Sequence, residues 1–217
     1  MQIAVCNFRH TMHPILRLIQ QGEGETLDFK KIVPGAMKIA KTMVSFANHK
    51  GGTLLIGVND NGSISGVRGL EEKYVLESAA SFFCKPEIFL EIKTWEIHGK
   101  EVLEVKIPEG EHKPYFAKDE QDKWWAYVRV RDESILASKV MLDVMRKSNS
   151  HETTLIEYTS KEKALFDYLK IHHRITLKQY CKLLNISRPR AQRILVNLIS
   201  AGVLRVHAIE KEEFYTI

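Results

Sequence analysis

The sequence predicts an α+β protein made of two folded units, and three observations carry this prediction. Near the N-terminus, helical apolar spacing is followed by the alternating pattern of antiparallel strands, which is typical of an α+β domain. Near the C-terminus, helix, helix-turn-helix and β-hairpin signals follow one another in the order of a winged helix. A polar stretch separates the two regions. We expect units at 14–147 and 160–217, a linker at 148–159, and a leader or edge strand at 1–13.

The first unit begins with a short amphipathic helix at 14–21. Residues 23–30 then alternate as an extended segment, and residues 36–48 carry apolar side chains at helical spacing after a Pro-Gly breaker. Gly51-Gly52 precedes the apolar run 53–58, which predicts a tight turn and a buried strand. The Asn-Asp-Asn-Gly sequence that follows predicts a hairpin turn and the start of another strand.

The rest of the first unit returns to helix and then changes to strands. Residues 71–84 predict a helix whose buried stripe contains Tyr74, Leu76, Ala79, Ala80 and Phe83. Segments with the strand period are 88–95, 102–107 and 124–130, and a closing helix is expected at 138–147. Of the adjacent Trp124 and Trp125, we expect one ring in the core and one nearer the solvent.

Capping signals predict three helices in the second unit. Thr159–Glu162 and Thr176–Gln179 each match a capping box. Ser187 is the expected N-cap of the third helix, and Gly202 is expected to end it. The buried face of this helix is predicted to hold Ala191, Ile194, Leu195 and Leu198, and a hairpin is expected from 203–206 and 213–217.

Composition restricts the class of protein. The 217 residues are 44% hydrophobic and 27% charged, which is ordinary for a soluble globular protein. Cys6, Cys84 and Cys181 are far apart, so neither a disulfide framework nor a paired-cysteine metal site is predicted. No apolar run reaches membrane-spanning length, and no signal-peptide core is visible. We expect a cytoplasmic protein without a membrane partner.

Positive charge is concentrated in the second unit. Residues 160–217 hold 11 Lys/Arg and 5 Asp/Glu, a net +6, whereas residues 1–159 hold 21 and 22, a net −1. Between Arg174 and Arg205 there are seven basic residues and no acidic one. Such asymmetry indicates a polyanion partner. The ordinary alternative is a basic face exposed to solvent.

The third helix of the second unit carries candidate base-reading residues. Arg188, Arg190, Gln192 and Arg193 lie on or near the face that its apolar stripe leaves free. Arginine pairs bidentately with guanine, and glutamine with adenine, when a helix enters the major groove. Lys178 and Lys182 on the preceding helix suit phosphate contacts. The alternative is that these helices mediate protein contacts or dimerisation.

Several motifs of the first unit occur in one order: Glu23-Gly-Glu-Thr-Leu-Asp28-Phe-Lys30, Ser45-Phe-Ala-Asn48, Gly51-Gly52, Leu55-Ile-Gly-Val58 and Tyr127-Val-Arg129-Val. With them the segment resembles the Schlafen-type AlbA-like domain of many bacterial DNA-binding regulators. The run from Leu183 to Leu204 resembles bacterial winged-helix regulators. The resemblance implies a transcriptional regulator that binds double-stranded DNA, and a homodimer would suit palindromic sites.

The same resemblance supplies a nuclease alternative. In Schlafen-type nucleases, acidic residues match Glu23, Asp28 and either Asn59 or Asp60 of this chain. Three clustered carboxylates could hold Mg²⁺ or Mn²⁺, which polarises a phosphate and activates water. Asp28 stands where Glu is usual and Asn59 directly follows the Gly-Val pair, which weakens such a site. The main expectation is therefore a binding protein without a cofactor rather than an enzyme.

Nucleotide binding and pure protein interaction are the remaining alternatives. The chain lacks a phosphate-binding loop of the GxxxxGK[ST] kind, because Gly51-Gly52 precedes a strand rather than a helix. His49 and Lys50 could still contact a phosphate, of ATP or of nucleic acid. Lys30 and Lys50 complete the set of candidate nucleic-acid-binding residues. An oligomerisation module with no nucleic-acid role is the last reading that the sequence leaves open.

Overall fold

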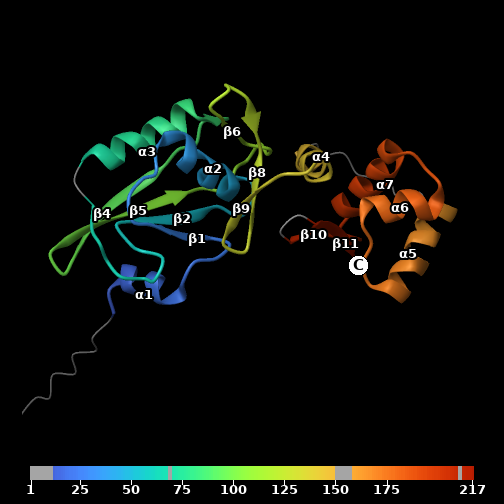
Figure 1. Cartoon of the computed structure of the whole chain (residues 1–217), viewed down its shortest axis with the longest axis horizontal. Coiled ribbons are helices and arrows are strands. Elements are labelled where there is room, and N and C mark those ends of the chain that lie inside the picture. The colour runs from blue at the N-terminus through green and yellow to red at the C-terminus, as the bar shows by residue number, and fades with distance from the viewer. Residues whose placement is uncertain (1–11, 68–69, 150–157, 210–211) are drawn as a thin grey trace, which may run out of the picture.

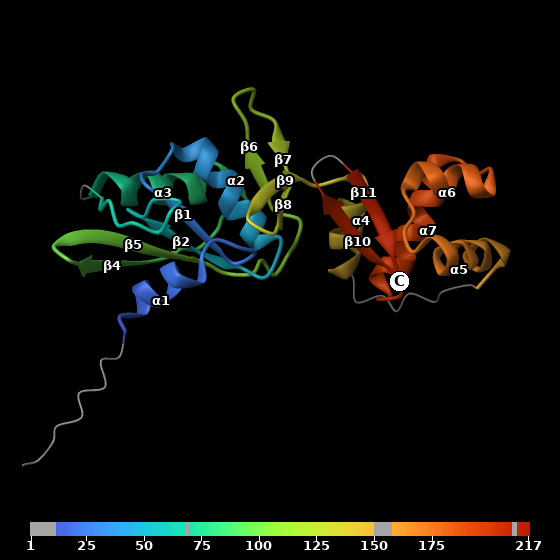
Figure 2. The same ribbon diagram turned by 60° about the horizontal axis from the view of Figure 1, so that its bottom comes forward.

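The computed structural model describes residues 12–67, 70–149, 158–209 and 212–217. It has the predicted α+β class with mostly antiparallel strands, and it places a sheet-containing unit beside a helical unit (Figures 1 and 2). The expected leader at 1–13 and linker at 148–159 lie mostly outside the described residues. No helix in the described ranges is long and apolar enough to cross a membrane.

A four-stranded sheet forms the centre of the first unit. Its strand order is β1-β2-β5-β4, with β1 parallel to β2 and the other two pairs antiparallel. The parallel pair is connected by helix α2, because antiparallel pairing could use a short turn but parallel pairing needs a crossover. The bounds are β1 Leu27–Lys30, α2 Ala36–Ala47, β2 Gly52–Ile56, β4 Glu91–Ile97 and β5 Lys100–Ile107.

Helices cover both faces of this sheet. Alternate residues of a strand point to opposite faces, so Leu54 and Ile56 pack in one cluster with α2 and α3 (Leu70–Phe82). Leu55 and Phe29 point the other way and pack against Ile15 of α1 (Pro14–Gln21). Figures 1 and 2 show α2 and α3 on one side of the sheet and α1 on the other.

The predicted turn at the start of β2 is confirmed. Gly51 has φ +73°, and a Cβ there would lie 2.7 Å from the carbonyl oxygen of Ile107. A Cβ on Gly52 would lie 2.6 Å from the ring of Phe46, so neither position has room for a side chain. The expected strand after the following turn is reduced to a single bridge between Val58 and Ile64.

Smaller sheets complete the first unit. Buried Asn48, at the end of α2, donates to the carbonyl oxygens of Tyr115 at 2.9 Å and Tyr127 at 2.8 Å, so it ties the helix to the segments before β6 and at β8. Its Oδ1 accepts from the Tyr115 amide at 2.7 Å. The strands are β3 Cys84–Lys85, β6 Phe116–Lys118, β7 Trp124–Trp125, β8 Tyr127–Val130 and β9 Glu133–Leu136.

Two burial predictions for the first unit are wrong. Trp124 and Trp125 are both exposed, at 38% and 41%, because the β6–β7 hairpin projects from the body of the unit (Figure 2). The Trp125 Nε1 instead donates to Asp119, and Lys85 lies over the Trp124 ring. Tyr74 is 74% exposed, since only the Leu76, Ala79 and Ala80 side of α3 faces the sheet.

The second unit has the elements that its capping signals predict. Both capping boxes form, at Thr159 with Glu162 and at Thr176 with Gln179. Ser187 is the N-cap of α7, although its side chain makes no capping hydrogen bond. The bounds are α5 Ser160–His172, α6 Leu177–Leu184, α7 Arg188–Ser200, β10 Arg205–Ile209 and β11 Glu212–Thr216. The winged-helix assignment of this order stays a prediction.

Helix α4 (Lys139–Ser148) lies between the two units in both views (Figures 1 and 2). The sequence placed it at the end of the first unit, but it also packs against α7. Its Val140 belongs to the apolar core of the second unit, and Met141 packs with Ala126 and Val128 of the first. Lys147 Nζ donates to Asn197 Oδ1 of α7 at 2.6 Å. The helix is therefore shared by both units.

Candidate nucleic-acid interface

The turn between α6 and α7 brings the basic residues of both helices to one end of the second unit. Asn185 ends α6 in the left-handed region at φ 47°, which a short polar side chain tolerates. Three residues later Arg188 is the first residue of α7. The side chains of Lys178 and Lys182 on α6 are exposed beside this turn.

Helix α7 is oriented by its apolar stripe. Ala191, Leu195 and Leu198 are buried in the core, and the predicted Ile194 is half-buried. Because these side chains point inward, Arg188, Arg190 and Arg193 are left exposed, while Gln192 is half-buried. The three arginines lie in the first two turns of the helix, where the macrodipole also attracts anions. This end of α7 therefore carries a concentration of exposed positive charge.

Two of the cations face a common hollow of about 230 Å³. Lys178 and Arg188 line it together with Leu177 and Cys181, and no carboxylate is among these lining residues. Lys178 and Arg188 thus give this hollow a positive charge.

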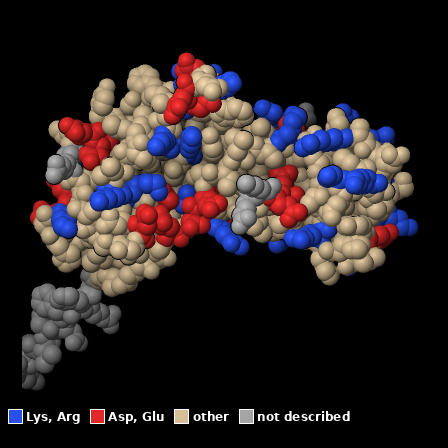
Figure 3. All heavy atoms as spheres, viewed as in Figure 1, with Lys and Arg blue, Asp and Glu red and all other residues tan. Residues whose placement is uncertain are grey.

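Helix α4 limits how much of α7 is accessible. The Lys147–Asn197 contact places α4 beside the C-terminal half of α7. The arginines lie in the N-terminal half of α7, away from this contact. The sequence does not predict this contact, because the two helices are separated by the linker. Figure 3 shows more Lys and Arg than Asp and Glu on the visible face of the second unit.

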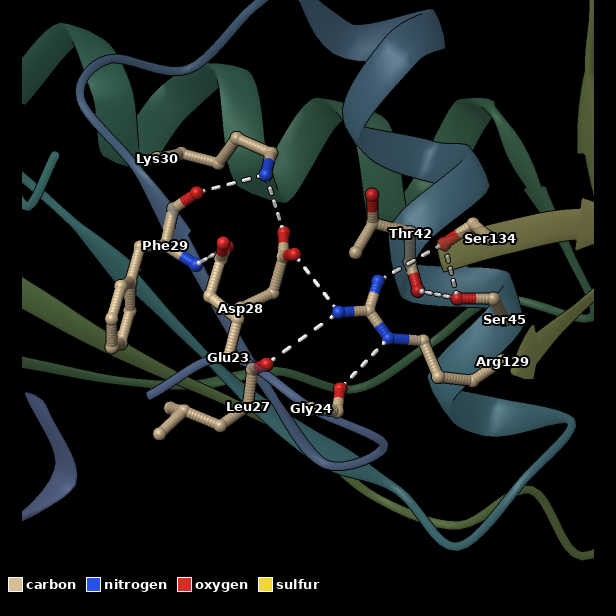
Figure 4. A network of polar contacts seen from close by, with 10 residues as sticks. All are labelled: Glu23, Gly24, Leu27, Asp28, Phe29, Lys30, Thr42, Ser45, Arg129 and Ser134. Carbon is tan, nitrogen blue, oxygen red and sulfur yellow. Dashed lines mark hydrogen bonds and ion pairs between the residues drawn. The ribbon is translucent and has the colours of Figure 1, made fainter. Parts of the chain in front are cut away.

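The structure does not group the three carboxylates proposed as a metal site. Glu23 Oε1 accepts from the Phe29 amide at 2.8 Å. Asp28 is 4% exposed and lies between two cations, with Arg129 Nη2 at 2.9 Å and Lys30 Nζ at 2.6 Å (Figure 4). Asp60 is exposed in the turn after β2. The described ranges contain no group of three His, Cys, Asp or Glu residues placed to hold a metal ion.

Arg129 is the residue of this region that the sequence did not single out. It is 5% exposed, and its Nε donates to the Gly24 carbonyl at 3.0 Å (Figure 4). Its Nη1 and Nη2 reach Ser134 Oγ at 3.4 Å and the Leu27 carbonyl at 3.5 Å. The only sequence signal was its place in the Tyr-Val-Arg-Val motif. The Arg129 guanidinium is thus paired with the Asp28 carboxylate, which the nuclease alternative assigns as a metal ligand.

The same network of polar contacts changes the pKa of Glu23 and pairs the charge of Lys30. Burial raises the pKa of the Glu23 carboxyl, the Phe29 amide opposes the rise, and neighbouring Asp28 adds to it. Lys30, a candidate nucleic-acid contact, is half-buried and already paired with Asp28 and with the Phe29 carbonyl. Lys50 differs from it, because it is exposed and lines an open groove of about 660 Å³ with Lys106 and Phe89.

Family models match both units. The model described as Schlafen, AlbA_2 matches residues 23–138, and the model of the PCI domain matches residues 144–213. The comparison with curated proteins finds no match.

Two solved structures are similar to this chain. The crystal structure of the DIP2311 protein from Corynebacterium diphtheriae is 20% identical with a TM-score of 0.44, and the match covers 63% of this chain and 30% of that one. The solution NMR structure of the N-terminal domain of an ATP-dependent DNA helicase RecG-related protein from Nitrosomonas europaea is 23% identical with a TM-score of 0.39. That match covers 68% of this chain and 97% of that domain.

Proposed function

Because this chain belongs to the Schlafen, AlbA_2 family, whose model matches residues 23–138, we propose that it binds nucleic acid and acts as a transcriptional regulator on double-stranded DNA. The observation that carries the proposal is the group of exposed cations on α6 and the first turns of α7. Its members are Lys178, Lys182, Arg188, Arg190 and Arg193. No acidic residue interrupts the chain between Arg174 and Arg205.

Each part of this group has a physical role in the proposal. The arginines of α7 are long enough to reach base edges, where a bidentate pair with guanine contributes about 1–3 kcal/mol of discrimination. Lys178 and Lys182 would contact phosphates and release counterions, which adds affinity without sequence information. Since α4 lies beside the C-terminal half of α7, the first turns of α7 would enter the groove.

We include a two-fold dimer in the proposal, because paired reading helices suit palindromic sites. Light scattering at micromolar concentration tests this part by itself. A mass of two chains is expected, and a mass of one chain, about 25.0 kDa, would remove the dimer from the proposal without affecting DNA binding.

The proposal is tested by fluorescence anisotropy with a labelled random-sequence duplex at low salt. The Arg190→Ala/Arg193→Ala variant is expected to bind at least tenfold more weakly than the wild type, since about 1.4 kcal/mol is tenfold in affinity. The matched control is Arg17→Ala/Lys38→Ala, which removes the same charge from exposed sites on α1 and α2. Equal losses of affinity in both variants would show that the loss comes from net charge and not from the position of the arginines. Absence of binding by the wild type would refute the proposal.

A further inference from the structure

A cavity of about 410 Å³ lies where the first unit meets α4 and the hairpin of the second unit. Its size is within the range of small-molecule sites in proteins. Strand β8, helix α4 and strand β10 form its sides. The lining residues named below are separate from the cations of α6 and α7, so the proposed DNA contacts do not explain this cavity.

The lining is divided into a polar side and an apolar side. The polar side chains Glu25, His49, Arg129 and Arg131 come from the first unit, and the second unit contributes His207 of β10, whose Nε2 pairs with Thr216 Oγ1 at 2.9 Å. The side formed by α4 and β10 is mostly apolar and includes Met141, Val144, Met145, Val206, Ala208 and Ile209. An apolar cavity with a few convergent polar groups is the usual form of a ligand site. The division favours a ligand with an apolar body and a polar end.

The polar groups differ in their capacity to bind a ligand. His49 Nδ1 has no hydrogen-bond partner within the described part of the chain, but this atom is inaccessible to solvent and so does not itself face the cavity. Burial lowers the pKa of the His49 imidazole from its ordinary value of 6.5, so the ring is neutral at pH 7 and one nitrogen can accept while the other donates. Arg131 is exposed, and it forms no ion pair with any residue that the structure describes. The charge of Arg129, in contrast, is already matched by Asp28.

The backbone at Arg131 is also unusual. Its φ is +56°, in the left-handed region that glycine adopts easily and an arginine does not. Residues held in this region cost of order 1–3 kcal/mol and cluster at ligand sites. The position lies in the turn from β8 to β9, where a glycine would relieve the strain. The geometry of the turn therefore does not require an arginine at position 131.

We propose that this cavity binds a small organic carboxylate with an apolar body, whose carboxylate pairs with Arg131 and whose apolar body packs between α4 and β10. The His49 ring lies on the same polar side of the lining. Glu25, exposed on the same side, accepts from an amino or hydroxyl group where the ligand carries one. The shared chemistry thus includes both fatty acids and apolar amino acids, which the test distinguishes.

The experiment follows titrations of the full-length protein by heteronuclear NMR, without nucleic acid. The probes are octanoate, L-methionine and, as the counter-probe, octylamine. Saturable shifts at amides of β8, α4 and β10 are expected with one or both carboxylates and not with octylamine. If L-methionine alone binds and Glu25→Gln removes its binding, the amino acid is the source. Absence of saturable shifts with both carboxylates, or equal binding of octylamine, would overturn the proposal.

Two variants and one control separate binding from folding. Arg131→Gly removes the guanidinium while relieving the backbone, so it is expected to keep or raise thermal stability and to weaken carboxylate binding at least tenfold. Ala208→Trp fills the cavity from the β10 side and is expected to abolish binding. Arg146→Ala is the control, because Arg146 is exposed on α4 outside the cavity. Unchanged affinity in a folded Arg131→Gly protein would refute the assignment.

A ligand in this cavity would contact the first unit and the β10–β11 hairpin at once. It would therefore change DNA affinity, a consequence that rests on the proposed function and that is typically about 5–150-fold in coupled systems. Because the titration contains no DNA, a failure of DNA binding leaves the ligand result intact, and a failure of ligand binding leaves the DNA result intact.

Discussion

The buried pair of Asp28 and Arg129 gives the sharpest test of what holds the first unit together. Asp28 is on β1 and Arg129 on β8, so the pair joins segments 101 residues apart. Arg129→Met removes the guanidinium but keeps an unbranched apolar side chain in place of the arginine stem. It leaves the Asp28 carboxylate buried beside Lys30 alone, and it leaves the Gly24 and Leu27 carbonyls without this donor.

The expected loss follows from burial. Removing one partner of a buried ion pair costs about 3–5 kcal/mol, because an uncompensated charge stays in a low-dielectric site. Lys30 recovers little of this, since its side chain is 31% exposed and such pairs contribute only about 0–1 kcal/mol. For a protein of this size each kcal/mol shifts the Tm by about 2–4 °C, so we expect a fall of about 6–20 °C. Adding Asp28→Leu removes the stranded charge and is expected to restore part of the loss.

Thermal unfolding followed by tryptophan fluorescence measures this directly. All three tryptophans, Trp95, Trp124 and Trp125, lie in the first unit, so the signal reports on that unit. Arg131→Ala is the matched control, because it removes an exposed arginine two residues away and surface changes usually stay within about 0.5 kcal/mol. If Arg129→Met and Arg131→Ala shift the Tm equally, the pair is not the stabilising contact that its burial indicates.

Three further predictions concern the first unit. Burial raises the pKa of Glu23 in the folded protein. The contribution of Glu23 to stability is therefore full below its ordinary pKa of 4.5 and is lost as the pH rises through the folded-state pKa. Urea unfolding at a series of pH values should show this loss of stability in the wild type and not in Glu23→Gln. Burial raises the pKa of the Cys84 thiol to about 12, so a Cys6→Ser/Cys181→Ser protein should resist Ellman's reagent at pH 8 until it is denatured, and rapid native labelling would contradict this. Gly51→Ala should destabilise the protein by more than about 1 kcal/mol, because φ is +73° and the Ile107 carbonyl oxygen would lie 2.7 Å from the new Cβ. Gly24→Ala is the control, since a Cβ there meets no atom within 4 Å. Equal Tm values for the two variants would contradict the close approach at Gly51.

Local signals in the sequence were sufficient for the elements that depend on neighbouring residues. The two capping boxes of the second unit form because donor and acceptor are three residues apart. Gly51-Gly52 predicts the turn before β2 because the required backbone conformation is a property of glycine itself. The apolar stripe of α7 predicts which of its side chains are exposed, and this orients Arg190 and Arg193 outward.

Features that depend on distant partners could not be predicted. The Arg129–Asp28 pair joins β8 to β1, which belong to two different sheets, and no spacing in the sequence encodes it. Trp124 is exposed because the β6–β7 hairpin projects from the first unit, although the residue types around it are those of a buried strand. The cavity forms because α4 packs against both units. The sequence assigned α4 to the end of the first unit alone, so it did not predict this packing.

The most direct test of the DNA-binding proposal is the salt dependence of duplex affinity in the wild type and in Arg190→Ala/Arg193→Ala. Each phosphate contact adds about 0.9 to the slope of log affinity against log salt. If both arginines contact phosphates, the slope should fall by about 2 in the variant, and if they read bases, affinity should fall at constant slope. A variant that matches the wild type in both slope and affinity would show that α7 does not contact DNA.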